Sequence, residues 1–205
     1  MERKIALSAV VIVVAFIGTI LIVTNLNQRN NDLAVCGVSA IAGAGVGGPF
    51  ELMNKKGEIV TDAEVITEPS LIYFGYTFCP DICPLDTARN VQAVQILEDK
   101  GIEVTPIFIS IDPKRDTPEV VGEYAYNFHD RMIGLTGTDE QIASVSKVYK
   151  TYYKAHDDGT DFYLVDHSVQ SYFNIPELGV VDFYGRAESP ELVAERMACV
   201  INQTS

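Results

Sequence analysis

Residues 70–84 read SLIYFGYTFCPDICP, and this segment shows most clearly how the chain is built. The run SLIYFG over 70–75 is almost continuously apolar, as a strand that is buried on both faces requires. A proline follows each of the two cysteines, Cys79 and Cys83, and disfavours helical backbone at the residue before it. Because Pro84 also suits the first position of a helix, both thiols are expected in a turn where a buried strand passes into a helix.

Strand and helix patterns alternate on the C-terminal side of this turn. Apolar residues recur every three or four positions over 85–97, and Gly101 then ends the helix. Thr117-Pro118, the capping box Thr138/Gln141 and Ser189-Pro190 mark later helix starts. The sequence predicts a mixed α/β sheet with helices on both faces. The expected helices span 85–100, 117–129, 138–152 and 189–201, and the expected strands span 70–75, 104–111, 133–135, 163–165, 169–173 and 180–184.

The N-terminus predicts a membrane anchor. Ile5 to Val23 is a run of 19 uncharged, mostly apolar residues, long enough to cross a bilayer as one helix. A cleaved signal peptide would have a shorter apolar core and a small-residue cleavage site, which does not follow Val23. Arg3 and Lys4 precede the span, so the N-terminus is expected in the cytoplasm and the rest of the chain outside a bacterial cytoplasmic membrane.

Three parts are expected along the chain: an anchor over 1–23, a tether with a lead-in strand over 24–47, and a folded domain over 48–205. The formal net charge is −13, and residues 1–30 contribute +2, so the exported part carries −15. Such an acidic surface repels nucleic acid, which excludes it as a partner, and keeps the domain soluble.

The four cysteines fall into two classes. The N–H groups and the positive dipole end of a helix N-terminus favour thiolates at Cys79 and Cys83, and a disulfide between them would close only a short loop, worth about 2 kcal/mol. These two cysteines are therefore assigned to chemistry. Linking Cys36 to Cys199 across most of the domain would contribute about 5 kcal/mol in the loop-entropy model. We expect this second pair to be a structural disulfide.

A CxxxC spacing does not by itself separate redox catalysis from metal binding, and the histidines are the natural third ligand. His129 follows a predicted helix and His156 lies in a polar turn, so both are expected to be solvated. His167 instead interrupts the apolar context YLVDHSVQSYF, where a buried imidazole needs a partner. Two thiolates and one imidazole suit Cu(I), and they could equally hold zinc with a water.

Other polar residues near the expected site receive supporting roles. Asp112 and Asp116 follow a strand end, where capping and turn formation are expected and support of the metal loop is the lesser reading. Asp166 is adjacent to His167 on a strand, so the two side chains should point to opposite faces. Tyr76 and Phe78 are expected to pack around the turn and limit solvent access.

Taken together, these motifs resemble the Sco/SenC family of copper proteins that assist cytochrome c oxidase assembly. The resemblance implies a thioredoxin-like fold and copper held by Cys79, Cys83 and His167, as Cu(I) and also as Cu(II). Two features depart from the family pattern: NIPELG at 174–179 replaces an Asp-Gly turn, and Cys36 and Cys199 are additional. The matching segments are GGPFEL at 47–52, YFGYTFCPDICP at 73–84, FISIDPKRDTPE at 108–119 and VDHS at 165–168.

The same resemblance implies a metallochaperone for the CuA centre of the oxidase. Its expected partners are the copper-binding subunit of the oxidase and another copper chaperone, with the membrane contacted through residues 5–23. A thiol–disulfide oxidoreductase that reduces the copper-binding cysteines of the oxidase is the enzyme alternative, and it would use Cys79 and Cys83. A peroxidase or redox sensor on the same fold is a third, weaker reading.

Overall fold

The computed structural model describes residues 16–24, 33–38, 45–157 and 159–204, and the chain divides into two compact units, Met1–Gly37 and Val38–Ser205. In the first unit, residues 16–24 are helical. Within the described residues, no helix has both the length and the apolar character that a membrane crossing needs. More than half of the span expected over 5–23 lies outside these residues, so the anchor stays a prediction.

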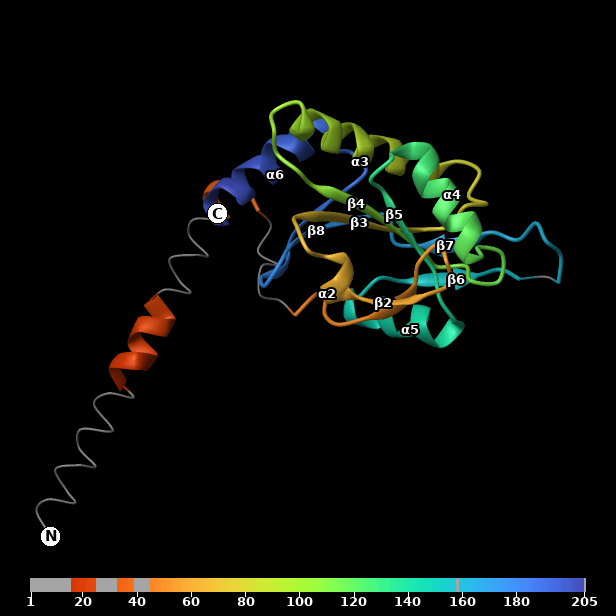
Figure 1. Ribbon diagram of the computed structural model, residues 1–205, viewed down its shortest axis with the longest axis horizontal. Coiled ribbons are helices and arrows are strands. Elements are labelled where there is room, and N and C mark those ends of the chain that lie inside the picture. The colour runs from red at the N-terminus through yellow and green to blue at the C-terminus, as the bar shows by residue number, and fades with distance from the viewer. Residues whose placement is uncertain (1–15, 25–32, 39–44, 158, 205) are drawn as a thin grey trace, which may run out of the picture. The chain divides into compact units, whose positions relative to one another are not determined.

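The second unit is built on a five-stranded sheet with the order β5-β4-β3-β8-β9 (Figure 1). Its first three strands are parallel, and β8 and β9 run antiparallel to their neighbours. Every residue of the central strand β3 is buried, as the apolar run predicted. The expected mixed sheet is present. Its strands are β3 (Ser70–Gly75), β4 (Thr105–Ser110), β5 (Ile133–Leu135), β8 (Ser171–Ile175) and β9 (Gly179–Tyr184).

Helices cover both faces of this sheet, with α3, α4 and α6 on one side and α2 and α5 on the other (Figure 1). The capping signals in the sequence mark their starts. Thr117 accepts a hydrogen bond from the Val120 N–H, and Thr138 and Gln141 form the expected capping box. The helices are α2 (Asp62–Val65), α3 (Ile82–Glu98), α4 (Pro118–Phe128), α5 (Asp139–Val148) and α6 (Pro190–Thr204).

Two small hairpins lie outside the main sheet: β1 (Glu51–Met53) with β2 (Ile59–Thr61), and β6 (Tyr153–Ala155) with β7 (Val165–His167). The sequence did not predict β1, β2 or β6, because three-residue strands with exposed positions lack a clear apolar alternation. The strand expected over 163–165 instead runs from Val165 to His167. His167 therefore pairs with Tyr153 in a hairpin, where its position is set by β6.

The buried face of α3 differs from the expected apolar stripe. Leu85 was expected to face the core and is exposed, whereas Asp86 and Asn90 are buried. Both polar side chains have partners: Asp86 accepts a hydrogen bond from the Tyr73 hydroxyl at 3.0 Å, and Asn90 donates to Ser171 Oγ at 2.8 Å. Polar residues can therefore face the sheet here because the strands supply matching groups.

The cysteines are in two oxidation states. Cys79 and Cys83 are free thiols, and Cys36 and Cys199 are disulfide-bonded. Cys79 lies in the strand–helix turn as expected, whereas Cys83 is already helical, because α3 begins at Ile82 and not at Pro84. That Cys36 pairs with Cys199 as a structural disulfide is our proposal, and it has a direct chemical test.

Helix α4 packs directly on β5 at Gly134. A Cβ atom added at this position would lie far inside van der Waals contact with the carbonyl oxygen and carbon of Val121, which are backbone atoms. A backbone group cannot swing aside as a side-chain end can, so the contact needs a residue without a side chain. We expect this close approach to fix the distance between the helix and the sheet edge.

We predict that Gly134→Ala lowers the free energy of unfolding by about 1–3 kcal/mol, because either the helix or the strand must shift. Urea unfolding of the two proteins measures the difference. Gly185→Ala is the matched control, since a Cβ there would meet only the Glu188 carboxylate at 3.9 Å. Equal loss of stability in both variants would contradict the assigned helix–strand contact.

We predict that mass spectrometry of a non-reduced digest finds one cross-linked peptide pair that joins Cys36 to Cys199. The physical reason is that the other two cysteines are free thiols. Alkylation of the unfolded, unreduced protein before digestion should label Cys79 and Cys83 alone, and unfolding is needed because Cys83 is buried in the native domain. Labelling of Cys36 or Cys199 in the unreduced protein would remove the structural disulfide.

Candidate metal centre

Three side chains that are distant in sequence come together at one end of the sheet. The Sγ atoms of Cys79 and Cys83 and a ring nitrogen of His167 all lie within 4.8 Å of one another. The Cys83 Sγ and the His167 Nε2 are 3.3 Å apart. No other group of three or more such ligands is found in the part of the chain that the structure describes.

Each ligand atom has a clear local support. Cys79 lies in the turn after β3, and its Sγ accepts a hydrogen bond from the Cys83 N–H at 3.3 Å. Cys83 lies in the first turn of α3 and is fully buried. Gly75 ends β3 directly beneath it: a Cβ atom there would lie 3.1 Å from the Cys83 Sγ and 3.0 Å from the Phe108 ring. The strand therefore ends in glycine where the sulfur needs the space.

The imidazole of His167 is prepared to act as a ligand. Its Nδ1 lies 2.7 Å from the backbone carbonyl oxygen of Ser168, which can only accept, so Nδ1 carries the proton and Nε2 presents its lone pair to the sulfurs. Burial lowers the pKa of His167, which favours the neutral ring. The rings of Tyr73 and Tyr76 pack edge-on against the imidazole, with ring centres 6.3 and 5.9 Å from its centre, and restrict its orientation.

The two thiols differ, which corrects the expectation that the helix N-terminus would favour both thiolates. Burial raises the pKa of Cys79, but hydrogen bonds from the backbone N–H groups of Asp81 and Cys83 outweigh this effect and leave the pKa below its ordinary value. Cys83 is fully enclosed, and burial raises its pKa. The site thus pairs a partly exposed, acidic thiol with a buried one that keeps its proton.

Asp116 supports the cysteine turn, the role that the sequence analysis had ranked lower. Its buried carboxylate accepts hydrogen bonds from the Thr77 N–H at 2.9 Å, the Thr77 hydroxyl at 2.5 Å and the Ser110 hydroxyl at 2.6 Å. Thr77 lies two residues before Cys79, and Ser110 ends β4. Asp116 therefore ties the turn to the neighbouring strand, and burial raises its pKa.

The surroundings of the site match the expectations only in part. Tyr76 is buried as predicted, but Phe78 is 53% exposed and does not close the turn. Asp166 points away from His167, as strand alternation predicted, and its carboxylate lies 2.6 Å from the His156 Nε2.

The third histidine lies elsewhere and is not solvated as expected. The His129 side chain is only 8% exposed, and its Nε2 lies 3.2 Å from the Glu98 carboxylate. His129 follows α4, and Glu98 ends α3. This imidazole is satisfied by a carboxylate partner and is not part of the cysteine cluster.

Sequence reasoning missed two contributors. The Tyr73 hydroxyl donates to Asp86, whose other oxygen accepts from the partly exposed Arg186 at 3.2 Å, so a polar chain runs from the buried strand to the surface. The sequence placed Tyr73 in an apolar strand, and no local pattern indicates that its hydroxyl would have a buried partner. Arg115 belongs to the segment FISIDPKRDTPE, and its position there indicated no role of its own. In the structure its guanidinium lies 5.0 Å from the centre of the Phe78 ring in the cysteine turn.

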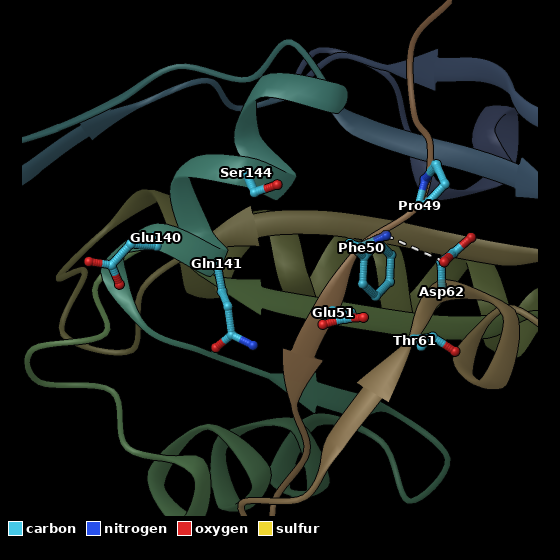
Figure 2. Close-up of a pocket in the computed structure, with 8 residues that line it drawn as sticks. All are labelled: Pro49, Phe50, Glu51, Thr61, Asp62, Glu140, Gln141 and Ser144. Atoms are coloured by element: carbon cyan, nitrogen blue, oxygen red, sulfur yellow. Dashed lines mark hydrogen bonds between the residues drawn. The ribbon is translucent and has the colours of Figure 1, made fainter.

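A separate pocket of about 380 Å³ lies beside β1, α2 and α5 (Figure 2). Its polar groups are hard oxygen donors, including the carboxylates of Glu51, Asp62 and Glu140, and one of them, Asp62, already accepts a hydrogen bond from the Phe50 N–H at 3.3 Å. No residue proposed as a ligand lines this pocket. The pocket is therefore separate from the cluster of Cys79, Cys83 and His167.

Known proteins resemble this chain in both sequence and structure. The family model described as SCO1/SenC matches residues 38–202. Protein SenC of Rhodobacter capsulatus is 46% identical over 202 residues, which are 98% of this chain and 91% of SenC. The crystal structure of Arabidopsis thaliana ScoI with copper bound is similar with a TM-score of 0.72 and 41% identity, covering 77% of this chain and 99% of that one.

A further solved structure is BsSco, described as a member of the Sco family of cytochrome c oxidase assembly proteins with a disulfide switch. It is 26% identical with a TM-score of 0.61, and the match covers 76% of this chain and 94% of BsSco. A thioredoxin-like α/β fold with a mixed sheet and flanking helices, as the resemblance implied, fits these structures. The match over the whole folded unit shows that the chain belongs to the SCO1/SenC family.

Proposed function

We propose that this protein binds one copper ion through Cys79, Cys83 and His167 and delivers it during assembly of the CuA centre of cytochrome c oxidase. The observation that carries the proposal is the convergence of two sulfurs and one imidazole nitrogen within 4.8 Å. A solved relative at 41% identity has copper bound, and another belongs to a family of oxidase assembly proteins. The copper-bound relative supports copper over the zinc that the ligand types alone would allow, and the second relative supports a role in oxidase assembly.

The ligand chemistry suits a cargo that must be taken up and released. Thiolates are soft donors that hold Cu(I), and the neutral His167 adds a third donor from the β6–β7 hairpin. Because burial raises the pKa of Cys83, copper must displace the proton of this thiol on binding. The affinity for copper therefore falls as the pH falls, since protons compete for the same sulfur. Cu(I) is the proposed main cargo, and Cu(II) is the second.

The proposed setting is the outer side of a bacterial cytoplasmic membrane. Residues 5–23 would anchor the chain there, and the tether would let the domain reach the copper-binding subunit of the oxidase and a second copper chaperone. The apolar run and the positive residues before it support this placement.

A second candidate function, thiol–disulfide oxidoreductase, is favoured by the difference between the two thiols. Cys79 is partly exposed with a lowered pKa, as an attacking thiolate should be, and Cys83 is a buried thiol beside it. In this reaction Cys79 would attack a disulfide of the partner, and Cys83 would then resolve the mixed disulfide. The protein would end oxidised and the partner reduced.

We predict that the reduced parent protein binds one Cu(I) per chain and that Cys79→Ser, Cys83→Ser and His167→Ala each weaken the site by more than about 100-fold, since a lost ligand costs more than a lost outer contact. Anaerobic competition titration against a chromogenic Cu(I) chelator measures the affinity. The parent affinity should fall as the pH is lowered, because protons compete for the Cys83 sulfur.

His156→Ala is the matched control, because this histidine is exposed and contacts Asp166 on the other face of the hairpin. It should bind copper as the parent does. If His167→Ala bound Cu(I) as tightly as His156→Ala, the ligand set would be wrong.

For the second candidate, we predict that reduction of a model disulfide depends on Cys79 and survives in His167→Ala. An ordinary cysteine thiol has a pKa of about 8.5. Because the pKa of Cys79 is lowered, the rate of disulfide reduction should reach half of its maximum at a lower pH than it would with an ordinary thiol. Stopped-flow kinetics with the metal-free protein measures this rate. Loss of exchange in His167→Ala together with the loss of copper binding would favour metal binding as the only use of the site.

A further inference from the structure

We propose that Arg115 is a positioning residue for copper binding, which fastens the hairpin that carries His167 to the turn that carries Cys79. The inference rests on the proposed copper site and concerns how its third ligand is kept in place. The side chain of Arg115 is only 8% exposed, and its guanidinium lies among residues of the cysteine turn and of the segment that leads into β7. Within the described part of the chain Arg115 contacts none of the three ligands, so it would act through His167.

On the hairpin side, Arg115 and Asp112 hold Tyr163 at three points. The Arg115 Nη1 donates to the carbonyl oxygen of Tyr163 at 2.8 Å, and the guanidinium carbon lies 3.6 Å from the centre of the tyrosine ring. The Tyr163 hydroxyl donates to Asp112 at 2.6 Å, and Asp112 is itself paired with the Arg115 Nε at 2.5 Å. Backbone, ring and hydroxyl of one residue are thus fixed two positions before β7 begins.

On the side of the cysteine turn, the same guanidinium lies 5.0 Å from the Phe78 ring and 5.6 Å from the Tyr76 ring. The Tyr76 hydroxyl accepts a hydrogen bond from the Val165 N–H at 3.3 Å, and the Tyr76 ring meets the His167 imidazole edge-on. Arg115 therefore packs against Tyr76, the turn residue of a second contact between turn and hairpin.

The hairpin needs such an attachment. Strands β6 and β7 pair only with each other among the described strands and are not part of the five-stranded sheet. A two-stranded ribbon is at best marginally stable by itself in water. The exposed ion pair between Lys114 and Asp157 is a weak support, because solvent screens it. A buried, planar guanidinium with several fixed partners is a much stiffer one.

One nitrogen of the Arg115 guanidinium lacks a hydrogen-bond partner in the described part of the chain. This atom, Nη2, is buried. A buried donor without a partner is destabilising, so the residue gives up some stability while it joins the two segments.

A double-mutant cycle tests the inference. Arg115→Lys keeps the charge but loses the planar fork, and we expect it to weaken Cu(I) binding about 10–100-fold, as loss of an outer contact does at other metal sites. The Cu(II) form should show weaker nitrogen hyperfine coupling by electron paramagnetic resonance. In the His167→Ala background the same substitution should have no further effect within about twofold, because the ligand through which it acts is gone.

The control is Arg131→Lys, whose partners Glu98 and the Val104 carbonyl lie at the opposite end of the sheet, before β4 begins. It should leave copper affinity unchanged. Urea unfolding of each metal-free variant separates loss of fold from loss of affinity. If Arg115→Lys proves unstable, Tyr163→Phe, which removes only the hydroxyl contact with Asp112, should weaken copper binding in its place.

The inference is overturned if Arg115→Lys, or Tyr163→Phe where the first does not fold, binds copper like the parent. It is also overturned if Arg115→Lys weakens binding equally with and without His167. Failure of the proposed function gives a different result, since the parent protein would then bind no Cu(I) tightly at all.

Discussion

The burial of β3 is the constraint on which the rest of the domain depends. This strand lies between a parallel neighbour, β4, and an antiparallel one, β8, and all its residues are enclosed. Its hydrogen bonds and its side chains on both faces are satisfied by the sheet and the helices, so its last residue, Gly75, has little freedom. The cysteine turn begins at that fixed point. The positions of the two thiols follow from the sheet.

The histidine reaches the site by a different route. It comes from a small hairpin outside the main sheet, whose attachment depends on individual polar and aromatic contacts. The site therefore joins a rigid half, made by β3 and α3, to a half with less support. Such a division would suit the proposed uptake and release of copper, because one ligand can leave while the cysteine turn keeps its shape.

The sequence predicted the parts that local signals encode. The apolar run of β3, the capping box at Thr138 and the paired cysteines each have a pattern that a single segment can carry. The sequence did not predict the features that depend on contacts between distant segments. Asp86 is buried because it accepts a hydrogen bond from Tyr73, and Asp116 supports the turn because it accepts one from Thr77. The unequal thiols were missed for the same reason, since burial of Cys83 comes from the packing of distant segments.

The pairing of β6 with β7 has a consequence for metal preference. Tyr153 lies opposite His167 and Lys154 opposite Asp166, so the imidazole faces the sulfurs and the carboxylate faces solvent. Side chains alternate along a strand, and a slip of one residue would exchange the two. A hard oxygen donor would then stand where a nitrogen donor stands now, and the centre would favour harder cations. In the proposed function, hairpin register would thus select the element that the protein carries.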